Sequence, residues 1–252
     1  MTFCIITCTY NAVRELPRTL ESVRRQSYRN VCHIIIDGKS SDGTAEMAYE
    51  YAANATGAHH VEVVSEKDKG LYDAMNKGIM QAKGDYIVFL NAGDTLASDT
   101  TLEEIARQLK RLGGEEPPAV IYGNTDIVDE EGFFLRPRRL QPPENLTWKS
   151  FIKGMLVCHQ AFYARTDLAK ETPYNLAYRF SADVDWCIRI MKLAQQKGLQ
   201  LHNTHTTLCK YLDGGMTVKN HRASLIERFR IMKKHYGLLL TIIVHLWFVI
   251  RK

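Results

Sequence analysis

Residues 66–94 read EKDKGLYDAMNKGIMQAKGDYIVFLNAGD. This segment holds a polar loop with a glycine, then an amphipathic helix, then a short apolar strand that ends at Asn91-Ala92-Gly93-Asp94. A carboxylate just past the C-terminal end of a core strand lies where open α/β sheets bind ligands. If the ligand is a diphosphate, we expect Asp94 to hold a divalent cation that bridges its oxygens.

Strands and helices alternate on both sides of this segment. Apolar runs predict strands at 3–7, 31–36, 61–65 and 86–90. Helical spacing of apolar residues predicts helices at 16–23, 44–53, 71–82 and 100–112. The alternation predicts an α/β fold, with a mostly parallel sheet covered by helices on both faces.

The pattern changes after Gly113-Gly114. A short β-like run at 120–122, a hairpin at 127–135 and a helix from just after Ser181 to about Gln196 are predicted in the second half. We interpret residues 1–218 as one domain whose halves, 1–115 and 116–218, bind the two substrates.

Bulk composition is that of an ordinary globular protein. The chain has 252 residues, 45% hydrophobic and 24% charged. Its first residues lack a basic region followed by a long apolar run, so no secretory signal is expected. Six scattered cysteines form no C-x-x-C pair. These features predict a reducing cytosol, without a zinc site or a disulfide framework.

The positive net charge belongs to the C-terminal tail. Residues 219–252 hold eight Lys and Arg against one acid, and the other residues hold 25 bases and 27 acids. The body therefore lacks the basic, aromatic-interleaved surface of a nucleic-acid-binding protein. We expect no nucleic-acid partner.

The tail combines basic residues with an apolar segment. Residues 238–250 are 13 in number, fewer than the roughly 20 that a bilayer-spanning helix needs. Trp247 and Phe248 suit the headgroup boundary. We predict that 219–252 is a basic and apolar helical anchor on the membrane surface, which places the protein in the cytoplasm, peripheral on the inner face of the cell membrane. The alternative is a C-terminal helix packed on the domain or on a partner subunit.

Polar residues follow three neighbouring predicted strands. Asp37 follows strand 31–36, Asp94 follows strand 86–90, and Thr9-Tyr10-Asn11 follow the first strand. Parallel strands end at the same edge of a sheet, so these side chains are expected to share one crevice. Turn stabilisation is the alternative for Asp37 and Asp42. It stays open for Asp42, whereas convergence favours function for Asp37 and Asp94.

The loop Asp68-Lys69-Gly70 lies before the helix that begins near Leu71. Unpaired N–H groups and the dipole at a helix N-terminus suit an anion. An ordinary charged first turn is the alternative, and it is the stronger one for this loop taken alone. Asn76 adds a polar group on a helix face that could look into the crevice.

Two carboxylates lie in the first turn of the helix after Ser181. Asp183 could serve as a general base, or either acid could simply complement the helix dipole. Asp183 and Asp185 point in different directions on a helix, so at most one faces a substrate. His159-Gln160 could bind an acceptor hydroxyl or phosphate, although a lone histidine is more often structural.

Together these residues resemble the family 2 glycosyltransferases with the GT-A fold, among them bacterial enzymes of exopolysaccharide and lipopolysaccharide assembly. The resemblance covers most of the chain, and the order and spacing of its motifs are more specific than any one of them. The motifs are Thr9-Tyr10-Asn11, Asp37-Gly38-x-Ser40-x-Asp42-Gly43-Thr44, Glu66-x-Asp68-x-Gly70-x-Tyr72-Asp73-Ala74-x-Asn76-x-Gly78 and Asn91-Ala92-Gly93-Asp94.

The resemblance implies roles for these positions. Asp94 would be the main ligand of Mg²⁺ or Mn²⁺, because Asn91 and Gly93 stand where the family often has acids. Asp183 would be the base, with Ala182 at the place of its usual glutamate partner. The acceptor would meet His159, Gln160 and Asp185. The nucleotide sugar would contact Thr9, Tyr10, Asn11, Asp37, Asp68, Lys69, Gly70, Asn76, Asn91, Ala92 and Gly93.

The function that the resemblance implies is an inverting sugar transfer. The donor would be a nucleotide sugar, with UDP first and GDP or dTDP possible, and the acceptor a hydroxyl of a glycan or a lipid-linked molecule. The alternative is a non-catalytic nucleotide-sugar-binding or assembly protein of the same fold. A nicotinamide oxidoreductase is not expected, because G-x-G-x-x-G is absent after the first strand.

Overall fold

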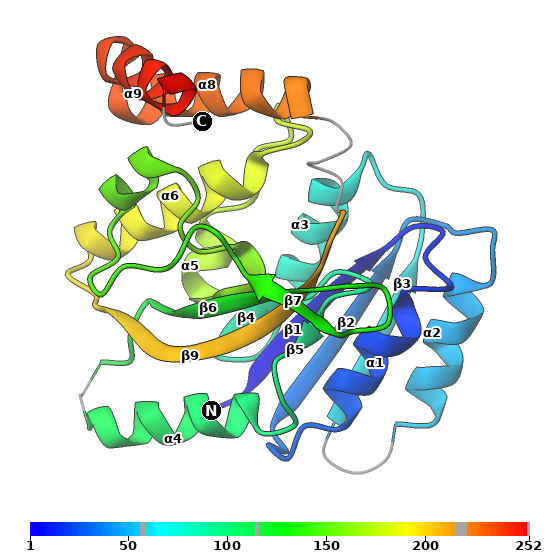
Figure 1. The fold of residues 1–252 in the computed structure, drawn as a ribbon. Coiled ribbons are helices and arrows are strands. Elements are labelled where there is room, and N and C mark those ends of the chain that lie inside the picture. The colour runs from blue at the N-terminus through cyan, green and yellow to red at the C-terminus, as the bar shows by residue number, and fades with distance from the viewer. Residues whose placement is uncertain (56–58, 114–115, 215–220, 251–252) are drawn as a thin grey trace.

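The computed structural model describes the chain except residues 56–58, 114–115, 215–220 and 251–252 (Figure 1). The described strands are β1 Phe3–Thr9, β2 Val31–Asp37, β3 His59–Ser65, β4 Tyr86–Phe89, β5 Thr95–Leu96, β6 Val120–Val128, β7 Phe134–Pro137, β8 Phe162–Arg165 and β9 Leu201–Leu212. The described α-helices are α1 Leu16–Arg24, α2 Thr44–Ala53, α3 Leu71–Gln81, α4 Thr101–Leu112, α5 Thr166–Glu171, α6 Ala182–Gln196, α8 His221–Tyr236 and α9 Leu238–Ile250. Two 3₁₀ turns are η1 Trp148–Lys153 and η2 His159–Ala161.

These strands form one sheet in the order β3-β2-β1-β4-β8-β6-β9-β5, with β7 paired to β6. The first four are parallel, as predicted. β8 then pairs antiparallel with both β4 and β6, and β5 pairs antiparallel with β9. The sheet is therefore mixed, which corrects the prediction of a mostly parallel sheet. The predicted hairpin exists as the antiparallel pair β6–β7.

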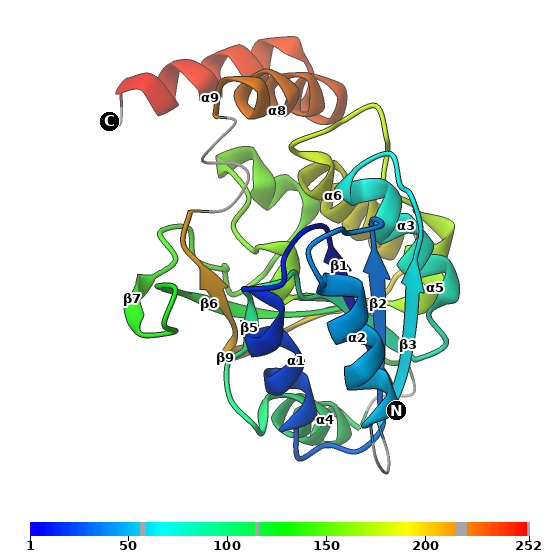
Figure 2. The ribbon, with the colours of Figure 1, turned by 90° about the vertical axis from the view of Figure 1, so that its right-hand side faces the viewer.

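Helices cover both faces of the parallel half (Figure 2). Alternate residues of β2 point to opposite faces: Ile35 packs with α1 and α2, whereas Ile34 and Ile36 belong to the core beneath α3. Gly78 lets α3 approach β1 closely, because a Cβ at that position would lie 2.4 Å from Ile6 Cγ2. This packing fixes the N-terminus of α3 at the carboxyl edge of the sheet.

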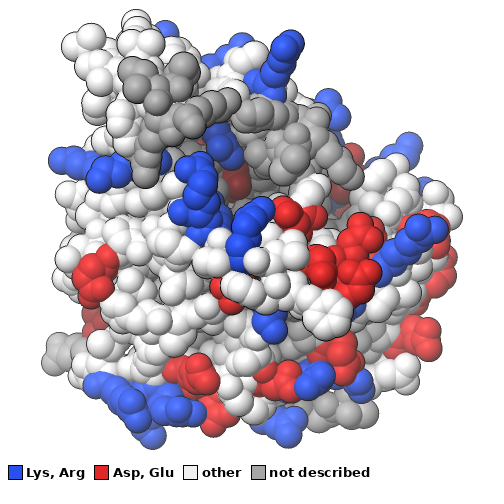
Figure 3. All heavy atoms as spheres, in the orientation of Figure 1, with Lys and Arg blue, Asp and Glu red and all other residues white. Residues whose placement is uncertain are grey.

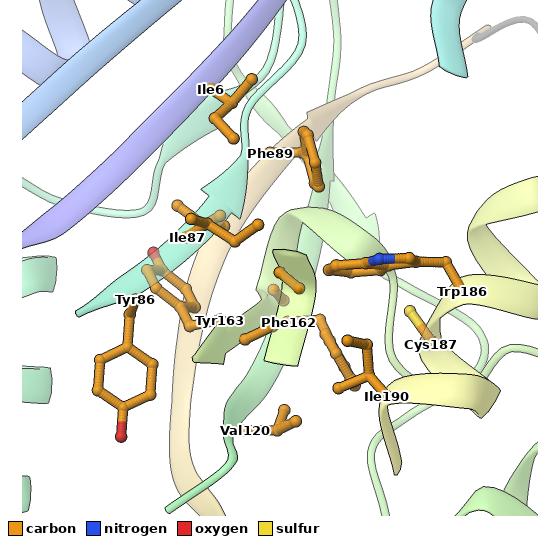
Figure 4. Close-up of a cluster of buried hydrophobic side chains, with 14 of the residues drawn as sticks. Ile6, Tyr86, Ile87, Phe89, Val120, Phe162, Tyr163, Trp186, Cys187 and Ile190 are labelled. Atoms are coloured by element: carbon orange, nitrogen blue, oxygen red, sulfur yellow. The ribbon is translucent and has the colours of Figure 1, made fainter. Parts of the chain in front are cut away.

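An aromatic cluster joins the two halves. Trp186 of α6 packs edge-on against Phe89 of β4 (Figure 4) and stacks on Tyr174 with ring centroids 4.9 Å apart. Tyr174 in turn stacks on Tyr72 of α3 at 5.2 Å. Offset stacking of this kind adds about 0.5–1.5 kcal/mol per pair to burial. The cluster holds the first turns of α3 and α6 together, where Asp183 lies.

The tail forms two helices, α8 and α9, that meet at Gly237 with a φ of +84°. Among the described residues no helix combines the length and apolarity needed to cross a membrane. The predicted boundaries near residue 115 and between 218 and 219 lie outside the described residues. All six cysteines are buried and free.

Candidate active site

Asp37 ends β2 at the predicted edge and is fully buried. Its carboxylate accepts hydrogen bonds from Thr9 Oγ1 (3.0 Å), Ser65 Oγ (2.6 Å) and both the N–H and Oγ of Ser40 (2.9 and 2.5 Å). Burial alone would raise the pKa of Asp37, but these hydrogen bonds lower it below its usual value. About four acceptor sites exist on a carboxylate, so Asp37 and Thr9 organise the loop from within.

Tyr10 and Asp68 both pack closely on this loop. A Cβ on Gly38 would lie 2.6 Å from Asp68 Oδ2 and 3.2 Å from Tyr10 Cδ2, so glycine at position 38 lets both side chains approach the backbone. Tyr10 is 68% exposed, and Asp68 keeps its place by accepting the Gly70 N–H at 2.8 Å. An exposed aromatic ring beside a carboxylate can stack on a nucleobase and accept its N–H groups.

Neighbouring predicted residues have mixed placements. Asn11, with a φ of +47°, accepts the Ser41 N–H and supports the same loop. Lys69, next to Asp68, is exposed. The side-chain amide of Asn76 forms two hydrogen bonds with the backbone of Tyr174. It donates to the Tyr174 C=O at 3.0 Å and accepts the Tyr174 N–H at 2.7 Å. The prediction that Asn76 contacts the donor is therefore corrected: this side chain joins α3 to the second half.

Asp94 is 4% exposed and lies inside the protein. Its Oδ2 accepts the Gln160 side-chain amide at 2.8 Å, and its Oδ1 accepts the Leu212 N–H at 3.0 Å. Burial raises the pKa of Asp94 to about 6, against the lowering effect of these two hydrogen bonds. Asp94 therefore connects the β4–β5 turn to η2 and to the end of β9.

The residues described do not fit the predicted metal site at Asp94. Both of its oxygens are occupied from inside the protein, and no group of three or more His, Cys, Asp or Glu side chains arranged for a metal occurs in the described part of the chain. Gly93 has a φ of +96°, and a Cβ there would lie 2.6 Å from Leu212 Cδ2. Position 93 therefore accommodates a glycine rather than an acid, because the Leu212 side chain covers it. Ala92 beside it is half-buried.

Asp183 lies at the carboxyl edge of the sheet with its side chain 18% exposed. Tyr72 donates its hydroxyl to Oδ1 at 3.3 Å, and His159 Nδ1 lies 3.4 Å from Oδ2. The other ring nitrogen of His159 is 3.2 Å from Asn91 Nδ2. With its proton on Nδ1, the imidazole donates to Asp183 and accepts from the Asn91 amide.

The environment of Asp183 favours its ionised form. Burial alone would raise its pKa, but the hydrogen bond that His159 donates and the charge of Arg228 lower it below the usual value. An ionised carboxylate with a partly exposed face can accept a proton from a hydroxyl placed against it. The Asn91–His159–Asp183 chain, held by Tyr72, is therefore the feature of this edge with the chemistry of a base.

Two residues assigned to the acceptor are buried. Gln160 is 2% exposed and holds Asp94. Asp185 is fully buried and accepts hydrogen bonds from Arg189 Nε (2.6 Å), Lys234 Nζ (3.2 Å) and His235 Nε2 (2.8 Å). Both predictions are corrected, and of the two acids in this turn only Asp183 is partly exposed.

The relationship to known proteins agrees with this geometry. Residues 4–180 match the family model described as Glycosyl transferase family 2. The chain belongs to glycosyl transferase family 2. It is 30% identical over 247 residues to a PGL/p-HBAD biosynthesis glycosyltransferase of Mycobacterium bovis, covering 97% of this chain and 90% of that relative. It is 29% identical over 199 residues to the amylovoran biosynthesis glycosyltransferase AmsB of Erwinia amylovora, covering 77% and 65% of the two chains.

Solved structures show the same fold. This family 2 glycosyltransferase is similar to S. aureus TarS 1–349 in complex with UDP-GlcNAc, with a TM-score of 0.71 at 16% identity over 92% of this chain and 65% of TarS 1–349. It is also similar to the mannosyltransferase PcManGT from Pyrobaculum calidifontis in complex with GDP-Man and Mn²⁺, with a TM-score of 0.64 at 15% identity over 97% and 70%. The curled mixed sheet matches these neighbours and confirms the GT-A prediction.

The family match ends at Phe180, before Asp183. The site of this glycosyltransferase nevertheless uses residues that follow it in α6, β9 and α8. Sequence reasoning did not assign roles to Ser40, Ser65 or Tyr72, although Ser65 ends a predicted strand at the same edge. It also missed Thr19, whose hydroxyl accepts the Gly93 N–H at 2.9 Å and donates to the Asp94 C=O at 2.8 Å.

Proposed function

We propose that this family 2 glycosyltransferase is an inverting enzyme that moves a sugar from a nucleotide sugar to a hydroxyl of a glycan or lipid-linked acceptor. The observation that carries the proposal is Asp183, a partly exposed carboxylate kept ionised and held by His159 and Tyr72. A non-catalytic binding protein would not need this arrangement. The relatives named for PGL/p-HBAD biosynthesis and for amylovoran biosynthesis support a role in biosynthesis of such products.

In the proposed reaction Asp183 accepts the proton of the acceptor hydroxyl as its oxygen attacks the anomeric carbon of the donor sugar. The bond between that carbon and the diphosphate oxygen breaks, and its electron pair leaves with the nucleoside diphosphate. A single displacement inverts the configuration at the anomeric carbon. Tyr72 and His159 keep Asp183 oriented throughout, so that little reorganisation is needed as the proton moves.

The donor would bind beside Tyr10 and Asp68. A UDP-sugar is proposed first, because the TarS structure holds UDP-GlcNAc; GDP and dTDP sugars are the other candidates. Lys69, next to Asp68, is exposed and can meet a phosphate. Asn91 Nδ2 lies 3.2 Å from His159 Nε2, and its buried Oδ1 has no hydrogen-bond partner in the described structure.

If Mg²⁺ or Mn²⁺ is bound, it would neutralise the negative charge that develops on the diphosphate leaving group. The PcManGT structure contains Mn²⁺, but Asp94 of this chain does not fit as its ligand, and no step of the proposed reaction passes through Asp94.

The tail is proposed to dock on the cytoplasmic membrane surface. In α9 the side chains of Leu239, Ile243 and Leu246 are 76%, 54% and 60% exposed and lie on one side of the helix. α8 supplies lysines and arginines next to this apolar surface, which suits anionic lipid headgroups. Flotation with vesicles of 30% anionic lipid tests this: the triple substitution of these three residues by serine should abolish binding, and unchanged flotation contradicts it.

Screening a panel of nucleotide sugars tests the proposed activity. A cognate donor should raise the melting temperature, and the same donor should be consumed when acceptor is present. Binding without consumption, and without any effect of Asp183→Asn, would favour the binding-protein alternative.

A further inference from the structure

Helix α8 of the tail reaches the segment just before the proposed base. The Glu227 carboxylate accepts the N–H groups of Arg179 (2.8 Å), Phe180 (2.8 Å) and Ser181 (2.9 Å). These three residues lead directly into α6, in which Asp183 is the second residue. Hydrogen bonds to an ionised acceptor are about twice as strong as neutral ones, so one side chain of the tail fixes the entry to the base helix.

The normal local cap of α6 is absent. Ser181 occupies the N-cap position, but its hydroxyl makes no capping bond and instead lies 2.9 Å from Ser224 Oγ of α8. A serine in this position ordinarily accepts an N–H of its own helix. Here Glu227 and Ser224 of α8 provide the hydrogen bonds that set where α6 begins.

The rest of α8 is fixed to the same body. Asp185 accepts hydrogen bonds from Lys234 and His235, and Tyr236 donates its hydroxyl to the Trp148 C=O at 2.6 Å while stacking on the Trp148 ring. α9, in contrast, exposes large apolar side chains. Figures 1 and 2 show α8 and α9 packed on each other above the body, where α9 also contacts η1, and Figure 3 shows a hollow bordered by charged side chains below the two helices.

We propose that α8 belongs to the catalytic unit, and that Glu227 is a positioning residue that sets Asp183 against His159 and Tyr72. The inference rests on the proposed role of Asp183 as the base. It divides the tail into two parts with different tasks: α8 completes the active site, and α9 provides the apolar side chains that dock on a membrane. The catalytic unit then extends at least through Glu227, well beyond the family match that ends at Phe180.

The test compares three variants of the full chain. Glu227→Ala removes all three acceptor contacts, and Glu227→Gln keeps a single carbonyl oxygen. Tyr236→Phe is the matched control, because it also removes a hydrogen bond from α8 to a main-chain partner but leaves residues 179–181 untouched. The readouts are kcat, the dissociation constant of the donor, and the pH at which kcat/KM falls on the acid side.

Glu227→Ala should lower kcat by about 10- to 100-fold, the cost of a base displaced by around 1 Å, with donor affinity within twofold of wild type. The pH at which kcat/KM of this variant falls on the acid side (its acid limb) should be higher than for wild type. The reason is that a displaced Asp183 loses the His159 hydrogen bond that lowers the pKa of Asp183. Glu227→Gln should give values of kcat and of the acid-side pH between those of Glu227→Ala and wild type. Tyr236→Phe should change neither kcat nor that pH. If Glu227→Ala does not fold, Glu227→Gln carries the comparison.

The inference is overturned if the folded Glu227 variant has the same kcat as Tyr236→Phe and if kcat/KM of both variants falls at the same pH on the acid side. That failure is distinct from failure of the proposed function. Equal transfer by Glu227→Ala and wild type, with Asp183→Asn inactive, refutes the inference alone, whereas a wild type that binds and transfers no nucleotide sugar refutes the function.

Discussion

Replacing Asp94 with asparagine separates a structural role from a metal-binding role. Burial raises the pKa of Asp94 from 3.8 to about 6. Each unit of pKa difference between the folded and unfolded states is worth about 1.4 kcal/mol. The ionised carboxylate therefore costs the folded state about 3 kcal/mol above pH 7. Because the pKa of Asp94 is raised in the folded state, the stability that its protonated form contributes is fully present below the unfolded pKa of 3.8. This contribution is lost as pH rises through the folded pKa of about 6.

Asparagine keeps the shape without the charge. Its Oδ1 can accept the Leu212 N–H, and Gln160 can turn its amide so that its own oxygen accepts from the new Nδ2. We expect the stability of Asp94→Asn relative to wild type to rise by about 2 kcal/mol between pH 4.5 and pH 8, measured by urea unfolding at both values. Asp94→Ala, which leaves the Gln160 and Leu212 donors unpaired, should instead lose about 2–4 kcal/mol at either pH.

The activity of Asp94→Asn completes the test. The variant should keep transfer within a few-fold of wild type, and the ratio of its rates with Mn²⁺ and with EDTA should match the wild-type ratio. Loss of transfer by a folded Asp94→Asn, or a change in that ratio, would refute the structural role and restore Asp94 as the metal ligand.

Three further outcomes follow from the contacts of the site. His159→Gln should lower kcat/KM about 10- to 100-fold, the worth of a hydrogen bond to a charged group, and move its acid limb to higher pH; an unmoved limb contradicts the His159–Asp183 contact. Gly93→Ala should cost about 1–3 kcal/mol in urea unfolding, because its φ is positive and Leu212 is in the way; equal stability would count against it. Asp185→Asn should cost about 3 kcal/mol at pH 7. Burial alone would raise the pKa of Asp185, but His235 and Arg189 hold it well below its usual range, so this stability is lost as pH falls below about 4 and the variant should approach wild type there; a pH-independent difference would refute it.

The parallel half of the fold could be predicted from the sequence because its signals are local. The run predicted at 31–36 is observed as β2 Val31–Asp37, and the helix predicted at 71–82 as α3 Leu71–Gln81. β9 was not predicted, since Leu201–Leu212 is dominated by Thr, His and Asn and shows no apolar run. The sheet is mixed because β8 pairs antiparallel with β4 and β6, and β5 pairs antiparallel with β9; these pairings join segments distant in sequence.

The candidate site was predicted in part for the same reason. The position of Asp183 in a first helical turn was visible, and so was the placement of Asp37 and Asp94 after strands. The partners of those carboxylates come from segments far away: Gln160 is 66 residues from Asp94, and Glu227 is 46 from Ser181. Whether a carboxylate faces a crevice or the interior depends on such partners, which no local pattern reports.

Transfer by Asp183→Asn, measured beside its affinity for the donor, tests the central claim most directly. The account predicts that the variant binds the nucleotide sugar with wild-type affinity and transfers about 10²- to 10⁴-fold more slowly, while a folded Asp185→Asn retains transfer. Wild-type transfer by Asp183→Asn would show that the proton of the acceptor goes elsewhere and would contradict the account.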